Sequence, residues 1–467
     1  MKVLFASAEA YPLAKVGGLG DVAGSLPKAL RELGHDVRIA MPMYGTIREA
    51  KDVGSFPVAI GGADHEAKLR TTRIGEVPVY LIDFAPLFDR PKVYEYPDDG
   101  QRFAFFGKAV LDMIPTAGWQ PDVVHLNDWH TALAAAFLKT TYRGDERYRG
   151  LRCVFTIHNL QHQGLFGREV FDWAGLPPET WDPEGVEFYG RMNFLKAGVV
   201  YADQVTTVSP TYAREIQTPE YGFGLEGLLR SRASKLSGIL NGIDYDVWNP
   251  AKDPHIPQKY SKSTLEKKAK DKSALQKGAG LAVESKIPLI GIVSRLTEQK
   301  GLDILIPAIP EIMNLGVQVV LLGTGEPVYE GPLERFSAAG KGFVAYVKYD
   351  EALAHRIYAG SDFFLMPSKF EPCGLGQEIS LRYGTIPIVR STGGLADTVS
   401  DVGANPKTGN GFVFTDYTPG ALADAVRRAV EFYRMRRGWR PLQQRAMGRD
   451  LSWSASAQTY ADLYKNA

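Results

Sequence analysis

Short apolar runs alternate with longer stretches of helical periodicity along the whole chain. At the start, Val3–Ala8 is an apolar run that suits a buried parallel strand. Residues 22–33 then place leucine and alanine side chains on one helical face, and Gly34 ends that helix. The glycine-rich segment 13–21 between them is expected to be a loop. With a further strand over residues 36–41, the pattern predicts a βαβ unit.

The same alternation continues in two series. Further strands of the first series are expected at Val79–Asp83, Asp122–Leu126, Arg152–Ile157 and Val205–Val208. Strands of the second series are expected at Ile287–Val293, Val317–Gly323, Phe343–Tyr346, Phe363–Met366, Ile386–Arg390 and Gly411–Phe414. Strands that alternate with helices favour doubly wound parallel sheets. The periodicity breaks near Asn241–Lys252, so two α/β domains are predicted, residues 1–241 and 242–452.

Composition narrows the class of protein without identifying an activity. The 467 residues favour two or three domains, and 54 Lys and Arg against 53 Asp and Glu give no reason to expect nucleic acid or an anionic membrane. No stretch reaches 18 apolar residues, so no transmembrane helix is expected. The two cysteines, Cys153 and Cys373, cannot form a disulfide framework and indicate a reducing compartment. The lysine-rich segment Lys259–Lys277 is interpreted as a solvated helix.

The first glycine-rich segment has the sequence KVGGLGD, from Lys15 to Asp21. Glycines after a strand let a ligand approach the backbone, the following helix offers free N–H groups to an anion, and Lys15 adds a positive charge. The alternative is that these glycines only serve a tight turn. Gly18-x-Gly20-x-x-Ala23 also fits a dinucleotide fingerprint, but the acidic residue expected at the end of the second strand is missing, which weighs against NAD.

Two segments of the second half point to similar chemistry. Arg295 and Lys300 flank the loop after the first strand of that half. A guanidinium and an ammonium at the start of a helix suit a pyrophosphate better than a surface ion pair. Thr392–Asp397 repeats the first segment, with GGLAD in place of GGLGD. This similarity is either a second ligand loop or a chance likeness of glycine turns.

A carboxylate and three backbone amides follow the strand expected at Phe363–Met366. Glu371 lies in the sequence FEPCGL, and the N–H groups of Cys373, Gly374 and Leu375 are expected at the start of a helix. Sugar hydroxyls need both hydrogen-bond acceptors and donors, and this set supplies both. Ordinary helix capping is the structural alternative.

The histidines occur in two pairs, in HLNDWH and in HNLQH. His158 and His162 have the spacing of metal ligands on a helix, but His158 ends a strand and Gly164 follows, so no helix is expected there. HExxH, Walker A and GxSxG motifs do not occur, and we expect no metal site. A histidine at a strand end either hydrogen-bonds a substrate or is satisfied within the core.

These motifs occur in one order along the chain: KVGGLGDV, HLNDWH, TIHN, VSPTYAREI, NGID, SRLTEQKG, FEPCGL and STGGLADTV. Together they resemble the motifs of bacterial glycogen synthases and the related plant starch synthases, over nearly the whole chain. The resemblance implies the GT-B fold, an α/β fold of two Rossmann-like, doubly wound parallel-sheet domains facing a central cleft. The C-terminal helix, residues 453–467, would complete the first domain.

The resemblance also implies an activity. It is that of a retaining glycosyltransferase (hexosyltransferase) in the cytoplasm, which moves glucose from ADP-glucose to the non-reducing end of an α-1,4-glucan such as glycogen. No cofactor and no metal are expected, because basic residues neutralise the leaving diphosphate. A synthase that uses UDP-glucose and an inactive glucan-binding protein on the same fold are the alternatives. An NAD-dependent oxidoreductase would leave Arg295, Lys300 and Glu371 without a joint role, and no segment matches the pyridoxal phosphate site of a glucan phosphorylase.

In the first domain, the resemblance assigns roles to residues that match the family motifs. Lys15 would lie near the distal phosphate and the donor glucose, and Gly18 would give a backbone contact. His158 and Asn241 would bind the transferred glucose, with the His158 carbonyl near the anomeric carbon. Asp128 would face the donor or the acceptor.

The remaining roles concern mainly the second domain. Arg295 and Lys300 would stabilise the departing diphosphate, and Glu371 with the three amides after it would hold glucose hydroxyls. Asp21, from the first domain, and Tyr349 would contact the nucleoside, Tyr349 by stacking on adenine.

One position departs from the family pattern. Many retaining GT-B enzymes have a second glutamate eight residues after the first, where this chain has Ile379, with Glu378 one place earlier. A shift of one residue rotates a helical side chain by about 100°. Glu378 is therefore not assigned to the ribose.

Overall fold

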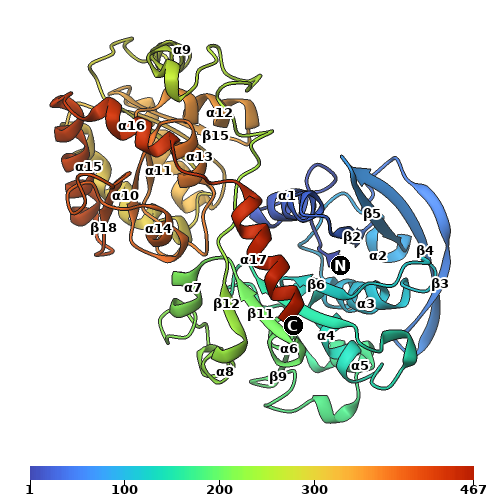
Figure 1. Ribbon diagram of the computed structural model, residues 1–467. Coiled ribbons are helices and arrows are strands. Elements are labelled where there is room, and N and C mark those ends of the chain that lie inside the picture. Colours follow the sequence, from blue (N-terminus) through green and yellow to red (C-terminus); the bar gives the residue numbers. More distant parts are fainter. Residues whose placement is uncertain (467) are drawn as a thin grey trace. The chain divides into compact units, whose positions relative to one another are not determined.

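The computed structural model describes residues 1–466, which form two compact units (Figure 1). Unit 1 comprises Met1–Asn241 and the C-terminal helix α17 (Trp453–Asn466), and unit 2 comprises Gly242–Ser452. Each unit contains one main sheet with helices on its faces. The chain leaves unit 1 after Asn241 and returns to it at Trp453, so unit 2 is inserted before the last helix of unit 1.

The main sheet of unit 1 has nine strands in the order β12-β11-β7-β6-β1-β2-β5-β4-β3. Their bounds are β1 Lys2–Ala6, β2 Asp36–Pro42, β3 Lys51–Ile60, β4 Ala63–Ile74, β5 Val77–Asp83, β6 Val123–Asn127, β7 Arg152–Ile157, β11 Gln204–Thr207 and β12 Leu236–Gly238. Strands β12 to β5 pair in parallel, whereas β4 pairs antiparallel with both β5 and β3. The sheet is therefore mixed, where the sequence pattern predicted parallel strands alone.

The antiparallel pair β3–β4 was not predicted. The second half of β3 alternates buried and exposed side chains, with Phe56, Val58 and Ile60 buried. Such alternation is typical of a strand with one face on a core and the other in water, which antiparallel edges allow. The hairpin extends the sheet at the edge far from β1 and β6, so it does not change the strands that carry the candidate site.

The helices of unit 1 include the one predicted over residues 22–33, which begins earlier than expected. Their bounds are α1 Gly18–Glu32, α2 Ala85–Phe88, α3 Asp99–Asp112, α4 Trp129–Lys139, α5 Arg168–Ala174, α6 Phe194–Tyr201, α7 Pro210–Glu215 and α8 Glu226–Ser231. Helix α1 begins at Gly18 rather than at residue 22. Gly18 and Asp21 therefore lie in the first turn of a helix, and the loop before it is shorter than predicted.

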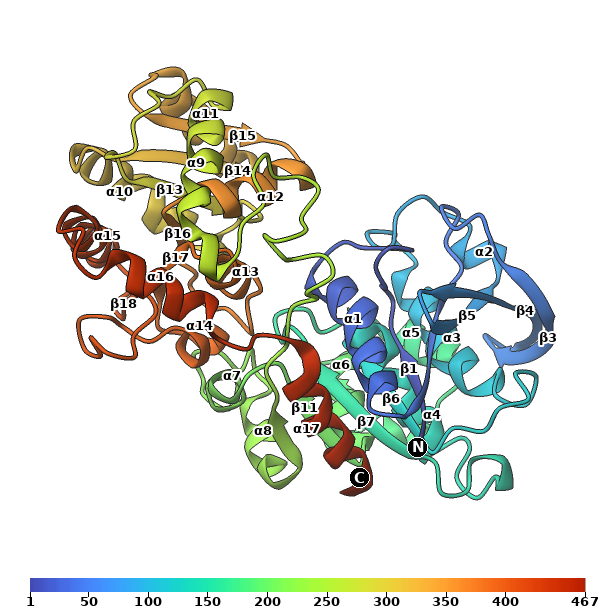
Figure 2. The same cartoon turned by 45° about the horizontal axis from the view of Figure 1, so that its top comes forward.

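The C-terminal helix expected over residues 453–467 is α17, and it packs on unit 1. Tyr460 and Tyr464 are buried, and the hydroxyl of Tyr464 hydrogen-bonds Nδ1 of His125 at 2.7 Å. His125 lies on β6, its Nε2 is 2.6 Å from the hydroxyl of Thr156, and burial lowers its pKa to about 3. Helix α17 also lies against α1 (Figures 1 and 2).

The sheet of unit 2 consists of six parallel strands in the order β15-β14-β13-β16-β17-β18. Their bounds are β13 Leu289–Val293, β14 Gln318–Gly323, β15 Phe343–Val347, β16 Phe363–Met366, β17 Ile386–Arg390 and β18 Phe412–Phe414. Counted within the unit, this is the order 3-2-1-4-5-6 of a doubly wound nucleotide-binding sheet. The apolar residues of these strands and of the helices on both faces form one large buried cluster and two smaller ones.

Helices on both faces of this sheet separate its strands. Their bounds are α9 Lys268–Gly278, α10 Leu302–Asn314, α11 Pro327–Ala338, α12 Glu351–Gly360, α13 Gly376–Arg382, α14 Gly393–Thr398, α15 Pro419–Arg434 and α16 Trp439–Met447. None of the helices in residues 1–466 has the length and apolar character needed to span a lipid bilayer.

The lysine-rich segment is only partly solvated, so the interpretation of a solvated helix is wrong for two of its residues. The Nζ of Lys268 donates to the carbonyl of Ala359 at 2.5 Å, and burial lowers the pKa of Lys268 to about 7. The Nζ of Lys272 pairs with Asp362 at 2.7 Å and also donates to the carbonyl of Ile287. The two side chains tie α9 to α12 and to the segments that lead into β13 and β16, which a count of lysines along the chain does not reveal.

Candidate functional site

Both sheets reverse their strand order at one place, between β1 and β6 in unit 1 and between β13 and β16 in unit 2. In open α/β sheets, ligands bind beside such a reversal, at the carboxyl ends of the strands. The predicted site residues follow strand ends: Lys15, Gly18 and Asp21 after β1, Asp128 after β6, His158 after β7, Asn241 after β12, Arg295 and Lys300 after β13, Tyr349 after β15, and Glu371, Cys373, Gly374 and Leu375 after β16. In each unit, the two strands at the reversal carry a large share of them.

The loop from β1 to α1 is held by a carboxylate that the sequence patterns missed. Glu9 is 3% exposed, and its Oε2 accepts hydrogen bonds from the backbone N–H of Val16 (2.5 Å) and of Gly17 (2.9 Å). Its Oε1 accepts from the hydroxyl of Tyr94 at 2.6 Å. A single glutamate after a strand belongs to no motif, so only its bonds to the KVGGL backbone reveal this role. Glu9 fixes the path of the chain directly after Lys15.

Gly17 and Gly18 have open space where a side chain would be. No atom lies within 4 Å of a Cβ built on either residue, and φ of Gly17 is −144°, which any residue can adopt. Neither backbone strain nor packing therefore requires glycine at these two positions. The open space favours close approach of a ligand over the alternative of a mere tight turn.

Lys15 and Asp21 lie beside each other at the start of α1. The Nζ of Lys15 donates to Oδ1 of Asp21 at 2.7 Å, and the side chains are 29% and 28% exposed. The ammonium also lies 5.3 Å from the ring centre of Tyr11. Lys15 thus places its charge at the first turn of α1, where the helix already favours an anion.

Asp128, at the end of β6, has an unusual backbone and environment. Its φ is +55°, a backbone conformation that residues other than glycine, asparagine and aspartate rarely adopt. Its Oδ1 accepts from the N–H of His158 at 2.7 Å, which ties the end of β6 to the end of β7. Burial raises the pKa of Asp128 to about 7, although the hydrogen bonds from the N–H groups of His158 and Asn159 oppose the shift.

His158 is oriented by Asn127, which was not predicted as a site residue. The amide Nδ2 of Asn127 donates to the carbonyls of Ala6 and His125, so its Oδ1 is the acceptor for Nε2 of His158 at 2.9 Å. Nε2 therefore carries the proton, and Nδ1 is left as an acceptor. Burial lowers the pKa of His158 to about 3, so the ring is neutral near pH 7. His158 and His162 lie in a loop, as the sequence predicted.

Asn241 ends unit 1 with an unsatisfied oxygen. Its side chain is 9% exposed, and its Oδ1 has no hydrogen-bond partner among residues 1–466. A buried acceptor without a partner costs free energy unless a ligand or water satisfies it. Asn241 is therefore suited to accept a hydrogen bond from a sugar hydroxyl.

In unit 2, Lys300 and Glu371 form a buried ion pair. The Nζ of Lys300 donates to both carboxylate oxygens of Glu371, at 2.8 and 2.6 Å, and the side chains are 17% and 6% exposed. The hydroxyl of Ser368 donates to Oε2 of Glu371 at 2.9 Å. Gly301, with φ +77°, lies against the carbonyl of Pro367, which a Cβ would approach to 2.1 Å. The loops after β13 and β16 therefore pack as one structure.

Arg295 lies on the same loop as Lys300 but makes no ion pair with any residue of the described part of the chain. Its Nη2 donates to Oε1 of Gln299 at 3.1 Å, and the side chain is exposed. The structural alternative of a surface ion pair is thereby excluded for Arg295 within residues 1–466. An exposed guanidinium held by a neutral amide is suited to a phosphate, which it can bind through two parallel bonds.

The two GGL segments differ in role. A Cβ on Gly393 would lie 1.9 Å from the carbonyl oxygen of Glu371, and one on Gly394 would lie 2.1 Å from that of Cys373. These glycines let α14 pack against the loop that carries Glu371. The alternative of a second ligand loop is therefore not favoured, because here the protein itself requires glycine.

The backbone after Glu371 keeps donors for a ligand. Gly374 has φ +75°, and neither its N–H nor that of Leu375 donates a hydrogen bond to another described residue. Cys373 is 4% exposed. Glu378, on α13, is 2% exposed, and burial raises its pKa well above the usual range. Its side chain is therefore buried, as is that of Glu371.

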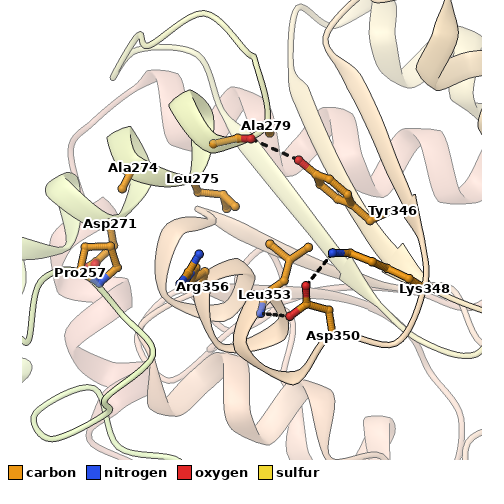
Figure 3. Close-up of a pocket in the computed structure, with 11 residues that line it drawn as sticks. Pro257, Asp271, Ala274, Leu275, Ala279, Tyr346, Lys348, Asp350, Leu353 and Arg356 are labelled. Carbon is orange, nitrogen blue, oxygen red and sulfur yellow. Dashed lines mark hydrogen bonds and ion pairs between the residues drawn. The ribbon is translucent and has the colours of Figure 1, made fainter.

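Tyr349 is 77% exposed between β15 and α12, and its ring offers a surface on which an adenine could stack. Unit 2 also has a hollow of about 300 Å³ nearby, lined by residues of α9, β15 and α12 (Figure 3). Tyr346, Lys348 and Asp350 lie on one side of it, with Lys348 and Asp350 paired at 2.7 Å. No predicted site residue lines this hollow, so it is separate from the candidate site.

The structure also shows how the residue types that bind metals, and the two cysteines, are arranged. Within residues 1–466, no group of three or more His, Cys, Asp or Glu side chains is arranged to hold a metal ion. Cys153 and Cys373 are both buried, and no disulfide joins them.

Family models match both halves of the chain. The model described as starch synthase catalytic domain matches residues 2–231, and the model described as glycosyl transferases group 1 matches residues 287–431. The first match spans most of unit 1 and contains Lys15, Asp128 and His158. The second contains Arg295, Lys300 and Glu371.

Curated relatives match over their full lengths. A glycogen synthase of Desulforudis audaxviator is 49% identical over 483 residues, covering 100% of this chain and 96% of the relative. A glycogen synthase of Moorella thermoacetica is 49% identical over 472 residues, covering 100% of this chain and 97% of the relative.

Solved structures agree with this result. The catalytic domain of starch synthase IV from Arabidopsis thaliana, bound to ADP and acarbose, has a TM-score of 0.93 and 37% identity, with 100% of this chain and 98% of that chain covered. A sucrose-phosphate synthase from Thermosynechococcus elongatus, with a TM-score of 0.62 and 17% identity, shares the fold. The two units therefore constitute a GT-B glycosyltransferase. The chain belongs to the glycogen and starch synthase family.

We expect Glu9 to be needed for turnover although it lies outside the family motifs. Replacement by Gln keeps the shape but places an NH₂ group against an N–H or O–H donor, so the loop that carries Lys15 should shift. Misplacement by about 1 Å can lower a rate by about 100-fold, and a fall in kcat of about 10- to 100-fold is expected for Glu9→Gln. Steady-state kinetics of glucose transfer measures it. Glu32→Gln, at the exposed end of α1, is the matched control, and equal kcat in the two variants would contradict the role of Glu9.

Asp128 should make stability depend on pH in a defined direction. Its pKa is raised in the folded protein to about 7 and is about 3.9 when unfolded, so the folded state loses stability as pH rises from 4 to 7. Asp128→Asn stays neutral. Relative to the wild type, this variant should therefore gain about 3 kcal/mol of unfolding free energy between pH 4 and pH 7. Urea unfolding of both proteins across this range tests it, and a difference that does not change with pH would refute the raised pKa.

Proposed function

We propose that this protein transfers glucose from ADP-glucose to the non-reducing end of an α-1,4-glucan and so elongates glycogen. The observation that carries the proposal is the set Arg295, Lys300 and Glu371 on the two loops that pack together after β13 and β16. A guanidinium without a counter-ion, an ammonium and a carboxylate provide cations for a diphosphate and an acceptor for sugar hydroxyls. Membership of the glycogen and starch synthase family supports the same reaction.

Unit 2 is proposed to bind the donor. Arg295 and Lys300 would neutralise the charge that develops on the diphosphate as it leaves, the role for which prearranged cations are most effective. Glu371 and the N–H groups of Cys373, Gly374 and Leu375 would hold the glucose hydroxyls. Lys300 already contacts Glu371, so the diphosphate and glucose positions would be adjacent.

Unit 1 is proposed to act on the transferred glucose and the acceptor. His158 is neutral with Nδ1 as an acceptor, and Asn241 has an unsatisfied oxygen, so both can accept hydrogen bonds from hydroxyl groups. Lys15 and Gly18 are proposed beside the distal phosphate. Asp128 is proposed to face donor or acceptor.

Adenine is the proposed base. The starch synthase IV structure is bound to ADP, and Tyr349 presents an exposed ring that could stack on the base, with Asp21 as a second nucleoside contact. A family member that uses UDP-glucose is the second candidate. We propose a cytoplasmic location, which the lack of a disulfide between the two cysteines supports, and a reaction without cofactor or metal.

Retention of the anomeric configuration is proposed to follow from same-face attack by the acceptor hydroxyl as ADP leaves, with the leaving phosphate as base. The alternative is a covalent glucosyl–carboxylate intermediate. Glu371 is committed to Lys300 and Ser368, and Asp128 accepts backbone N–H groups, so neither carboxylate is arranged as a nucleophile.

Glucose transfer from radiolabelled ADP-glucose to glycogen, measured beside UDP-glucose, tests the proposal. We expect higher kcat/KM with ADP-glucose. Arg295→Ala should lower kcat by about 100- to 1,000-fold, as loss of one group that stabilises transition-state charge does. Arg437→Ala is the matched control, because Arg437 is also an exposed arginine of unit 2 and lies away from strand ends.

Equal kcat/KM with ADP-glucose and UDP-glucose would contradict the proposal that adenine is the base, but not the proposal of glucose transfer. Near-normal kcat in Arg295→Ala would contradict the assignment of the diphosphate to Arg295. Absence of transfer from either donor would favour the inactive glucan-binding alternative.

A further inference from the structure

Aromatic rings that are exposed to solvent are rare in this protein. In the described part of the chain, three aromatic side chains are more than one-third exposed: Tyr189 (85%), Tyr349 (77%) and Phe223 (37%). Tyr349 already has a proposed role. Tyr189 and Phe223 belong to unit 1 and take no part in the proposed reaction, so the reason for their exposure has to be sought elsewhere.

Tyr189 occupies a tight turn that disfavours it. Strands β9 (Glu187–Phe188) and β10 (Arg191–Asn193) pair antiparallel with Phe188 opposite Arg191, which leaves Tyr189 and Gly190 as a two-residue turn. Both have positive φ, +49° and +77°. Turns of this kind usually have asparagine, aspartate or glycine at the first position, because a bulky side chain is strained there.

Phe223 lies in a second turn of the same form. The N–H of Leu225 donates to the carbonyl of Gly222 at 2.8 Å and closes a turn over Phe223 and Gly224, whose φ values are +49° and +84°. Again an aromatic residue precedes glycine at the position that disfavours it. Two of the five residues other than glycine with positive φ in the described chain are therefore exposed aromatic residues.

The two turns lie against each other. A Cβ on Gly224 would lie 2.9 Å from Cζ of Phe188, and the rings of Phe188 and Tyr189 are 4.7 Å apart between centres. Phe188 and Tyr189, together with Phe223 on the neighbouring turn, are the residues that we call the aromatic platform. It lies on unit 1 near β9 and the start of α8 (Figure 1).

The aromatic platform is tied to the loop that carries His158. The side chain of Gln163, 6% exposed, donates from Nε2 to the carbonyl of Phe223 at 3.1 Å. Its Oε1 accepts from Nδ2 of Asn193, at the end of β10, at 2.6 Å. Gln163 follows His158 by five residues and bridges both turns, so the platform is connected to the position proposed for the transferred glucose.

We propose that the aromatic platform binds the α-glucan acceptor several glucose units away from the growing end. Backbone strain at two positions that hold rings in water does not help the fold, and such strain marks functional sites. The flat apolar faces of glucose rings suit stacking on aromatic rings, whereas a protein partner would need a larger apolar patch than three rings. The inference rests on the proposed glucan-elongating function.

Variants that keep the turn and remove the ring test the platform. Tyr189→Asn, and the double variant Tyr189→Asn with Phe223→Asn, place a favoured residue at each strained position, so the fold should be retained or stabilised. The KM for glycogen should rise about ten-fold in the double variant, the effect of losing one strong aromatic contact. The kcat and KM for maltotriose, a short acceptor that under this proposal does not extend to the platform, should stay within two-fold of the wild type. Tyr189→Phe, which keeps the ring, is the matched control.

Three results would overturn the inference. The first is an unchanged KM for glycogen, and the second is an equal rise in KM for glycogen and maltotriose. The third is a lowered thermal midpoint with unchanged KM, which would mean that the rings serve the fold. Retarded migration in native gels that contain glycogen gives an independent measure of affinity, and the double variant should migrate faster than the wild type. If the wild type itself transfers no glucose to either acceptor, the proposed function fails, a result distinct from failure of the platform.

Discussion

The reversal of strand order in each sheet is the constraint on which the rest of the structure depends. Where neighbouring strands send their connections to opposite faces, no helix covers the carboxyl ends of the two central strands. Loops after β1 and β6, and after β13 and β16, are therefore free to carry chemistry instead of packing. Both units have this arrangement, but the side chains at the strand ends differ. Unit 1 has the neutral His158 and Asp128 with its raised pKa. Unit 2 has cationic side chains and the carboxylate of Glu371, which is paired with Lys300.

The charged side chains near these strand ends differ in whether they have a charged partner within the protein. Lys300 is held in place by its ion pair with Glu371, whereas Arg295 is held by the neutral amide of Gln299 and makes no ion pair among residues 1–466. A buried ion pair contributes little to stability, but it fixes the positions of both partners. In unit 1 the buried carboxylate of Glu9 uses three hydrogen bonds to shape the loop of Lys15. The site thus depends on buried groups that orient the exposed ones.

The sequence predicted most of the fold, because buried parallel strands and amphipathic helices leave strong local patterns. Strands β7, β16 and β17 have the predicted bounds. What it missed depends on contacts between distant residues: the edge hairpin β3–β4, the burial of Lys268 and Lys272, and Glu9. Local similarity also misled, since Gly17 and Gly393 share a motif, yet one faces open space and the other packs on Glu371.

Hydrogen–deuterium exchange with and without ADP tests the central claim most directly, that the nucleotide sugar is bound by the loops at the strand-order reversals. ADP should slow exchange of amides in residues 294–301 and 371–376, which follow β13 and β16. Amides that line the separate hollow, in residues 274–278 of α9 and 353–356 of α12, should exchange at the same rate in both states. Protection confined to the hollow, or no protection after β13 and β16, would contradict it.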